Sequence, residues 1–482
     1  MVKINVLKSS KPKPSRAETF KKTFIDWSIG LSCHGYPKIF RNVSKIIKSI
    51  WLFCFTLSAV VCAFVIYRNV SEFLDHDVIT NIRVIDESQS VFPTITFCNL
   101  NPFVTQSAYN LMRNLSENDS NQSNFSSTRE KLDVLFSRVQ TALFHANKPE
   151  YGDENRKLLG FRLEDMLLFC HFNQKDCSSK DFSWYFSYEY GNCFQFNSGL
   201  NLAGYSIPLK NSTKPGLDYG FFLILILGNV SNKYVSSLSS GLRVFIHNSS
   251  FRPLPEDGID IKTGTLTNIA IKKSLTRKEP SPYSDCLSQN LTKPFLYQET
   301  VRLYKFYRQR DCLDLCFQKL TIKSCSCYAL SLPNLYNDSV PCIESLHGRC
   351  TADVYTLFSK NDMQQLCDEC PLECDEIAYE YSLSMSDFPV DQLVNSLFED
   401  VSFKNSYFQD SLEKTKQKAV GFRVFFNRLK YTFISEKPKT SITDLIANIG
   451  GTLGLYLGMS ILSFMEIIEF LIQLIFVLFN RI

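Results

Sequence analysis

Two long apolar segments, one toward each end of the chain, constrain what this sequence can fold into more than any other feature. The first covers residues 50–67, eighteen positions without a charge, and the second covers residues 445–479, interrupted only by Glu466 and Glu469. A helix of about twenty apolar residues crosses a bilayer, and no other stretch of the chain is long enough to do so. The sequence therefore predicts a membrane protein with two transmembrane helices.

The second segment is too long for one straight span. Thirty-five helical residues would measure roughly 50 Å, whereas the hydrocarbon core of a bilayer is about 30 Å thick. The helix must tilt, break or project, and we place a break at Gly458-Met459-Ser460, a little under halfway along. Closely spaced glycines and two carboxylates are costly in lipid unless they face protein or water. This composition favours a helix that lines a cation pathway.

Charge predicts the orientation. Residues 1–48 carry eleven Lys or Arg against two carboxylates, a net charge of +9, so that the +4 of the whole chain leaves −5 for the rest. The positive-inside rule then puts both termini in the cytoplasm of a plasma-membrane protein. We read the basic segment as an orientation signal that contacts lipid headgroups rather than nucleic acid. The expected segments are a cytoplasmic N-terminus at 1–48, a first transmembrane helix at 49–69, an extracellular domain at 70–440, a pore-lining second transmembrane helix at 441–479 and a cytoplasmic C-terminus at 480–482.

Cysteine and asparagine patterns support the same topology. Fourteen of the seventeen cysteines lie between Cys98 and Cys374, an even number confined to the predicted extracellular side, which favours a disulfide framework. A zinc site at the two close cysteine pairs, 325/327 and 367/370, is the alternative. Sequons for glycosylation open at Asn114, Asn118, Asn121, Asn124, Asn211, Asn229, Asn248, Asn290 and Asn337.

The extracellular segment reads as α+β. Strand patterns cover residues 91–97, 221–227, 242–247 and 266–272, and helical patterns cover 129–147 and 389–398. Ten of the fourteen extracellular cysteines fall between Cys286 and Cys374, which predicts a disulfide-stapled module.

Five motifs in order resemble the degenerin / epithelial sodium channel / acid-sensing ion channel family. Ser32-Cys33-His34-Gly35 is similar to its His-Gly gating motif, and Gly458-Met459-Ser460 is similar to its Gly-x-Ser selectivity motif. Between them lie Phe92-Pro93-Thr94-Ile95-Thr96-Phe97-Cys98-Asn99, Gly191-Asn192-Cys193-Phe194-Gln195-Phe196-Asn197 and the cysteine block from Tyr307 to Cys327, in which Arg310 departs from the pattern. Short tails and a compact extracellular domain look most like the cnidarian peptide-gated sodium channels.

The resemblance implies an assembly and a set of disulfides. The channel would be a homo- or heterotrimer with related subunits, permeable to sodium and sensitive to amiloride, without a cofactor. The implied pairs are Cys98–Cys193, Cys170–Cys177, Cys286–Cys374, Cys312–Cys370, Cys316–Cys367, Cys325–Cys350 and Cys327–Cys342.

The resemblance also implies roles for single residues. Gly458, Met459 and Ser460 would form the selectivity filter, with Gly454, Glu466 and Glu469 lining the pore; the alternative for the two carboxylates is snorkelling to the inner interface. His34 and Gly35 would act in gating, although a histidine beside a glycine is otherwise a turn residue. Ala447 matches the degenerin position, where bulk holds the gate open, and Asn448 stands where some relatives carry Asp.

The resemblance leaves the agonist open. An extracellular ligand, a neuropeptide above all, is the main hypothesis, and a proton-gated or constitutively open sodium channel is the alternative. A two-span scavenger-type receptor that does not conduct, or an ATP-gated channel, would carry fewer cysteines. Because no Gly-x-Ser-x-Gly, His-Glu-x-x-His or P-loop motif occurs, we expect no enzyme activity.

Overall fold

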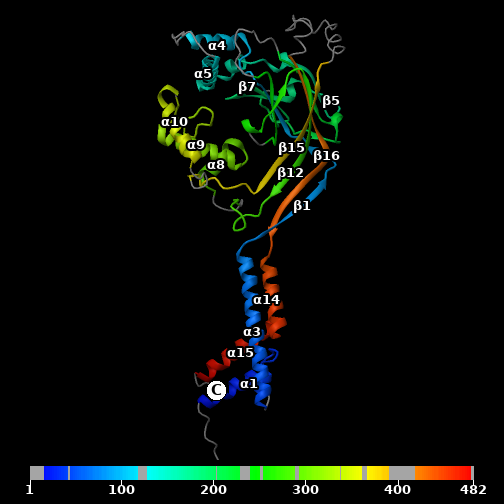
Figure 1. Ribbon diagram of the computed structural model, residues 1–482, viewed down its shortest axis with the longest axis vertical. Helices are drawn as coiled ribbons and strands as arrows, with labels where there is room; N and C mark the ends of the chain where they lie inside the picture. Colours follow the sequence, from blue (N-terminus) through cyan, green and yellow to red (C-terminus); the bar gives the residue numbers. More distant parts are fainter. Residues whose placement is uncertain are drawn as a thin grey trace, which may run out of the picture. The chain divides into compact units, whose positions relative to one another are not determined.

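The computed structural model describes eleven stretches of the chain, which group into two units. The described residues are 16–41, 44–117, 128–201, 203–227, 239–249, 253–287, 293–336, 338–342, 344–360, 366–389 and 418–478. The terminal unit combines Met1–Ile79 with Glu436–Ile482, and the central unit is Thr80–Ser435. Each unit is described by itself below (Figure 1).

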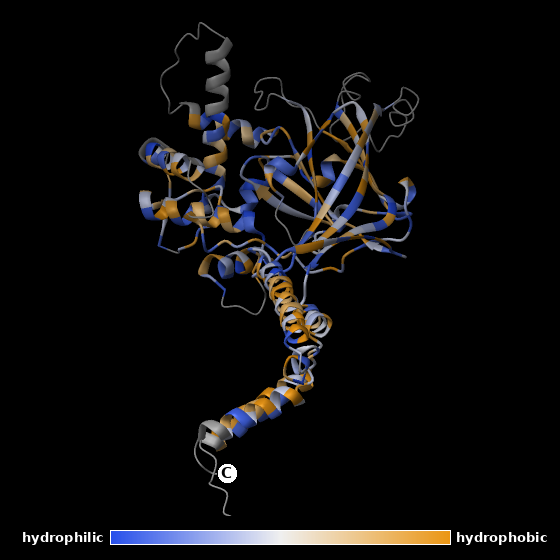
Figure 2. Cartoon of the chain, turned by 60° about the horizontal axis from the view of Figure 1, so that its bottom comes forward, coloured by the Kyte–Doolittle hydropathy of each residue, from blue (hydrophilic) through white to orange (hydrophobic). Residues whose placement is uncertain are grey.

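The terminal unit contains both apolar segments as helices. Its elements are α1 (Arg16–Gly30), α2 (Tyr36–Arg41), α3 (Lys45–Leu74), α14 (Ile442–Leu457) and α15 (Ile461–Leu478). Helix α3 is long and apolar enough to cross a membrane, and almost none of its side chains is buried within the chain. Figure 2 shows apolar residues along the helices of this unit. A helix that is apolar all round needs lipid or protein around it.

The second apolar segment is broken where the sequence predicts. Helices α14 and α15 together pass the same test of length and composition as α3, but they meet at an angle of 76° across residues 458–460. The predicted break at Gly458 is therefore confirmed. Just before the start of α14, Lys439 Nζ forms ion pairs with Glu72 (2.8 Å) and Asp77 (3.2 Å). These ion pairs connect the segment that leads into α14 with the C-terminal end of α3.

The central unit is built on two sheets that share one core. The seven-stranded sheet has the order β15–β12–β16–β9–β4–β5, and β1 also pairs with β16. Strands β12 and β16 run parallel, whereas β12–β15, β16–β9 and β9–β4 are antiparallel. The bounds are β1 (Val78–Asp86), β4 (Leu167–Phe172), β5 (Lys175–Asp176), β9 (Phe221–Ile226), β12 (Thr265–Arg277), β15 (Asp375–Asp387) and β16 (Ala419–Pro438).

The second sheet is antiparallel and has the order β11–β10–β3–β7–β6. Its strands are β3 (Thr94–Asn99), β6 (Phe182–Ser187), β7 (Gly191–Phe196), β10 (Gly241–His247) and β11 (Ile259–Lys262). Two short pairs, β2 (Ser90–Val91) with β8 (Asn211–Ser212) and β13 (Cys327–Tyr328) with β14 (Val340–Pro341), complete the strands. Phenylalanines from both sheets fill the shared core, among them Phe97, Phe182, Phe196, Phe221 and Phe422.

The four predicted strand regions are observed as strands, and the predicted helix at 129–147 is α5. The predicted helix at 389–398 lies outside the described residues apart from Pro389. Helices α4 (Gln106–Glu117) and α5 (Thr128–Asn147) pack on each other around a second small core. Shorter helical pieces are η1 (Pro149–Tyr151), α6 (Asp153–Lys157), α7 (Leu163–Met166), η2 (Ser179–Asp181), η3 (Leu217–Tyr219) and η4 (Pro255–Asp257).

The cysteine-rich region is helical, which the sequence pattern did not predict. It forms α8 (Phe295–Tyr304), α9 (Gln309–Cys325) and α10 (Glu344–Lys360). In α9 the buried face is made of Cys312, Leu315, Cys316 and polar residues, so it lacks the leucine periodicity of an ordinary amphipathic helix. Cys312 and Cys316 stand four residues apart on one helical face, from which they bond Cys370 and Cys367.

All fourteen cysteines between 98 and 374 are paired. The seven disulfides are Cys98–Cys193, Cys170–Cys177, Cys286–Cys374, Cys312–Cys370, Cys316–Cys367, Cys325–Cys350 and Cys327–Cys342. They coincide with the pairs that the resemblance implies. Cys33, Cys54 and Cys62, all in the terminal unit, are free thiols.

Glu369 connects two of the three helices in the cysteine-rich region. Its carboxylate accepts hydrogen bonds from Lys319 Nζ on α9 (2.6 Å) and from the backbone N–H of Leu296 in α8 (3.1 Å). The hydrogen bond from Lys319 lowers the pKa of Glu369 below its ordinary value, against the opposing effect of burial.

We predict that Glu369→Gln destabilises the protein at neutral pH by at most about 1 kcal/mol, because both partners are about one-third exposed and solvent screens the pair. A carboxylate with a lowered pKa contributes stability above its unfolded pKa, about 4.3, and loses it as the pH falls through the folded value. The difference in thermal unfolding midpoint between the full-length proteins should therefore shrink below about pH 4. Glu376→Gln, at an exposed position of β15, is the matched control; a difference that does not change with pH would contradict this account.

Candidate functional site

The break between α14 and α15 is held by local backbone geometry. Gly458 has φ +66°, a left-handed conformation that a residue with a side chain adopts only under strain. Its N–H donates to the carbonyl of Gly454 (3.0 Å), which closes the last turn of α14. Directly before α15, the N–H of Ser460 donates to Ser463 Oγ (3.0 Å) in the first turn of that helix. Gly458 thus terminates α14, and the two serines form a hydrogen bond at the start of α15 on the other side of the bend.

The loop at residues 31–35, between α1 and α2, contacts this break directly. The N–H of His34 donates to the carbonyl of Leu457 (2.9 Å), and the thiol of Cys33 donates to the same oxygen (3.1 Å). A helix that ends inside an apolar segment leaves carbonyls without intrahelical partners. The loop supplies partners for one of them.

Gly458 and His34 are packed so closely that a side chain on the glycine would not fit. A Cβ built on Gly458 overlaps the imidazole of His34. Gly35 also has a left-handed φ, +87°, and its α-carbon faces the ring of Trp51 on α3. The absence of side chains at Gly458 and Gly35 therefore allows the loop to lie against the break.

Glu466, one turn into α15, is bound to the same loop. Its carboxylate accepts from the N–H of Ser32 (2.9 Å), and its backbone carbonyl accepts from Trp27 Nε1 (3.1 Å). The hydroxyl of Ser32 also lies 2.7 Å from that of Ser463, which is fully buried. One end of α15 is consequently joined to the loop through a carboxylate, a hydroxyl and an indole.

An aromatic contact continues this connection away from the bend. The rings of Trp27 on α1 and Phe470 on α15 stack with centroids 4.4 Å apart, and Phe24 meets Phe470 edge-on at 6.1 Å. Figure 1 shows α1 beside α15 in the terminal unit. The two helices and the loop therefore form one packed body around the break.

Other predicted pore residues lie apart from this contact. Glu469 accepts from Gln473 Nε2 (3.1 Å) on its own helix. Ala447 and Asn448 are exposed on α14, about eleven residues or roughly 16 Å before the break. Among the described residues, added Cβ atoms on Gly450 and Gly451 meet nothing, and one on Gly454 meets only a carbonyl at ordinary contact distance, so no described residue packs on this face of α14.

The structure thus brings His34, Gly35, Gly458 and Glu466 into one cluster and leaves Ala447, Asn448 and Glu469 outside it. The sequence analysis did not single out Trp27, Ser463 or Phe470. Ser463 had no typical signal, because the residue that accepts from the N–H of the helix cap at this position is usually Glu or Gln. Trp27 and Phe470 had none, because their stacking depends on how α1 and α15 pack.

The remaining predicted sites are described only in part. Asn114 is exposed near the end of α4, whereas Asn211 in β8 and Asn248 beside β10 are half-buried. The other predicted sequons lie outside the described residues; they are Asn118, Asn121, Asn124, Asn229, Asn290 and Asn337. Within the described stretches, no group of three His, Cys, Asp or Glu side chains is arranged to hold a metal ion.

The match to a family of ion channels makes this chain a membrane channel subunit with a disulfide-rich extracellular domain of mixed α and β structure, and not an enzyme. A family model described as "Amiloride-sensitive sodium channel" matches residues 29–470, a range that includes the 31–35 loop, the break and Glu466. The chain belongs to this family of sodium channels, whose members lie in the plasma membrane and form multimeric channels with related subunits.

Individual relatives are similar along most of their length. The bile acid-sensitive ion channel of Homo sapiens is 27% identical over 498 residues, which cover 97% of this chain and 89% of the relative. Acid-sensing ion channel 2 of Homo sapiens is 25% identical, with 96% and 87% covered. The FMRFamide-activated amiloride-sensitive sodium channel of Cornu aspersum is 24% identical, with 93% and 82% covered.

We predict that Gly458→Ala displaces the 31–35 loop. Left-handed geometry costs an alanine about 1–2 kcal/mol, and the new methyl group overlaps His34. In a Cys54→Ser/Cys62→Ser background, the remaining free thiol is Cys33, which is 4% exposed. The variant should react with a thiol reagent about tenfold faster, since 1.4 kcal/mol corresponds to a factor of ten.

Gly30→Ala is the matched control for this experiment, because an added Cβ there meets nothing and the backbone is not left-handed. Equal thiol reactivity in Gly458→Ala and Gly30→Ala would show that the glycine is not needed for the contact.

Proposed function

We propose that this chain is a subunit of a trimeric, amiloride-sensitive, sodium-permeable cation channel that an extracellular ligand of the neuropeptide class opens. The observation that carries the proposal is the contact between the 31–35 loop and the break at 458–460. An uninterrupted membrane anchor has no use for a left-handed glycine in its span, whereas broken helices with exposed carbonyls occur where a span lines a cavity.

The bare face of α14 supports assembly around an axis. Ala447, Gly450, Gly451 and Gly454 lie on one side of this helix, and none of the described residues covers Gly450 or Gly451. Small residues let helices approach closely in a membrane. Three copies arranged with this face inward would surround a pathway, with the segments 49–69 and 441–479 as spans and residues 70–440 outside the cell.

In this arrangement Gly458, Met459 and Ser460 form the narrow stretch, and Gly454, Glu466 and Glu469 line the pore. A ring of carbonyls or carboxylates selects cations by replacing water ligands. His34 and Gly35 act by supporting the break from the cytoplasmic side, and Ala447 and Asn448 form the outer gate. Glu466 combines both roles, since its carboxylate already accepts a hydrogen bond from the loop.

The agonist is a separate part of the proposal. Three of the relatives are named for bile acid, acid and the peptide FMRFamide, so the family contains channels with different triggers. The described central unit carries a rigid, disulfide-bonded helical region, through which a ligand could shift the population of open channels. Proton gating or constitutive opening remains the second candidate.

Two-electrode recording from oocytes that express the full chain tests the proposal. We expect an inward sodium current that amiloride blocks and that an amidated Arg-Phe peptide evokes. A current evoked by acid or a bile acid instead would keep the channel and replace the agonist. No current from surface-labelled protein, alone or with related subunits, would contradict the channel proposal.

We predict that Ala447→Trp raises the resting sodium current several-fold, because a bulky side chain at a crowded axis separates the three helices. Ala447 is exposed within the single chain, so the substitution does not disturb the subunit itself. Ile446→Trp is the matched control, since residue 446 is also exposed but lies about 100° around the helix. Equal resting currents in the two variants, at equal surface expression, would contradict the assignment of the gate to Ala447.

A further inference from the structure

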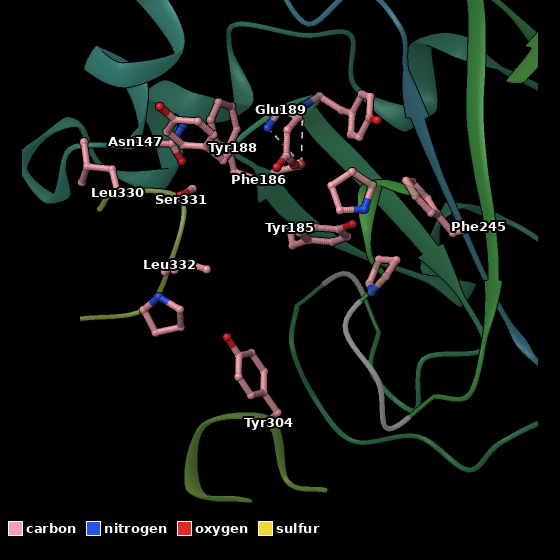
Figure 3. Close-up of a pocket in the computed structure, with 15 residues that line it drawn as sticks. Asn147, Tyr185, Phe186, Tyr188, Glu189, Phe245, Tyr304, Leu330, Ser331 and Leu332 are labelled. Carbon is pink, nitrogen blue, oxygen red and sulfur yellow. Dashed lines mark hydrogen bonds between the residues drawn. The ribbon is translucent and has the colours of Figure 1, made fainter. Parts of the chain in front are cut away.

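An aromatic pocket in the central unit has no role in the account given so far. The cavity measures about 340 Å³, within the range of small-ligand sites. Six aromatic side chains line it: Tyr185, Phe186, Tyr188, Tyr190, Phe245 and Tyr304. Figure 3 shows Tyr304 rising from α8 on one side, while Tyr185 and the β6–β7 turn lie on the other.

One charged side chain lines the pocket. Glu189 is the single charged residue among those that line it, and none of them is Lys, Arg or His. Among the described residues Glu189 has no ion-pair partner; its carboxylate accepts only from Ser187 Oγ (3.2 Å). In Figure 3 this carboxylate extends from the β6–β7 turn toward the ring of Tyr185. Arg156 and Arg243 lie beside the pocket, but each forms an ion pair with another carboxylate, Asp153 and Asp260 respectively. The cavity therefore combines electron-rich ring faces with a carboxylate that forms no ion pair among the described residues.

The walls of the pocket are held in place before any ligand arrives. On one side, Ser187 Oγ accepts from the backbone N–H groups of Glu189 and Tyr190, which fixes the β6–β7 turn. On the other, the fully buried Gln318 donates to the carbonyls of Ala329, Leu332 and Pro333. A preformed site loses little free energy in ordering itself around a ligand.

The protein already uses one of these rings to bind a cation. The guanidinium of Arg156 lies over the ring of Phe186 at 5.8 Å. Aromatic faces attract guanidinium and quaternary ammonium groups at this range, and sites that bind such cations surround them with several rings. A nearby carboxylate strengthens the attraction.

From this geometry we propose that the pocket binds an organic cation of the guanidinium or quaternary ammonium type, held by the rings of Tyr185 and Tyr304 and by the carboxylate of Glu189. Such a ligand would contact the turn of the five-stranded sheet and helix α8 at once. Binding would thus change the relation between a sheet and the disulfide-bonded helices, which makes this the ligand site of the channel proposed above. The cation comes either from an arginine side chain of a peptide or from a free amine.

Direct binding to the full-length protein in lipid nanodiscs tests the inference without relying on current. The probes are phenylalanyl-arginine amide, its citrulline analogue, which is neutral but has the same shape, and tetramethylammonium. We expect the arginine probe to bind about tenfold more tightly than the citrulline probe, and Glu189→Gln to weaken the arginine probe to the same extent. Tyr304→Leu should abolish binding.

Two exposed positions outside the pocket give matched controls, Glu164→Gln and Tyr205→Leu, neither of which should change the affinity. Competition by tetramethylammonium that depends on Tyr304 would point to a free amine as the source, and its absence to a peptide side chain. Equal affinity for the arginine and citrulline probes, or no effect of Glu189→Gln, overturns the inference. If Tyr304→Leu does not fold, Glu189→Gln decides alone, because Glu189 is an exposed side chain.

The inference rests on the proposed function only for its effect on gating. If the arginine probe binds in a way that depends on Glu189 and Tyr304 but no current is evoked, the ligand-gated channel is contradicted and the proposed binding site still stands. A peptide-evoked current that is unchanged in Glu189→Gln, together with unchanged binding, would overturn the site and leave the channel.

Discussion

The backbone carbonyl of Leu457 is the group on which the terminal unit depends. A helix that stops within an apolar segment leaves backbone carbonyls without intrahelical partners, and a buried carbonyl without a hydrogen bond is costly. His34 N–H and the Cys33 thiol both donate to this oxygen. The break at Gly458 and the loop at 31–35 therefore require each other, although more than four hundred residues separate them. The packing of α1 on α15 and the hydrogen bonds of Glu466 join the same loop and helices.

The central unit is stiffened by its core and its disulfides. Two sheets share a core of phenylalanines, whose large rings pack from both sides, and disulfides hold the helical region beside them. Closing loops of 58 and 51 residues by Cys312–Cys370 and Cys316–Cys367 restricts the unfolded chain strongly. In the folded protein the same bonds make α9 and the 366–374 segment move as one piece. A ligand between such a body and the sheet can transmit a displacement rather than dissipate it.

Polar groups within the central unit fix the places where rigid parts meet. Glu369 joins α8 and α9, and Gln318 holds the 329–333 segment through bonds that include three carbonyls. Buried or half-buried polar side chains of this kind stabilise little in net terms but select one arrangement, because every alternative leaves them unsatisfied. The aromatic pocket lies between two walls that are fixed in this way.

The sequence by itself determined the two apolar spans, the break at Gly458, four strand regions, one long helix and the even set of extracellular cysteines. These properties are local: hydropathy, periodicity and glycine conformation depend on neighbouring residues. Helix α9 escaped prediction because cysteines and polar residues occupy its buried positions, so that its periodicity is visible only once the disulfides are known. The aromatic pocket and the contacts of Trp27, Ser463 and Phe470 were decided by the tertiary structure alone. They bring together residues distant in sequence, and no local pattern records which surfaces of α1, α8 and α15 will meet their partners.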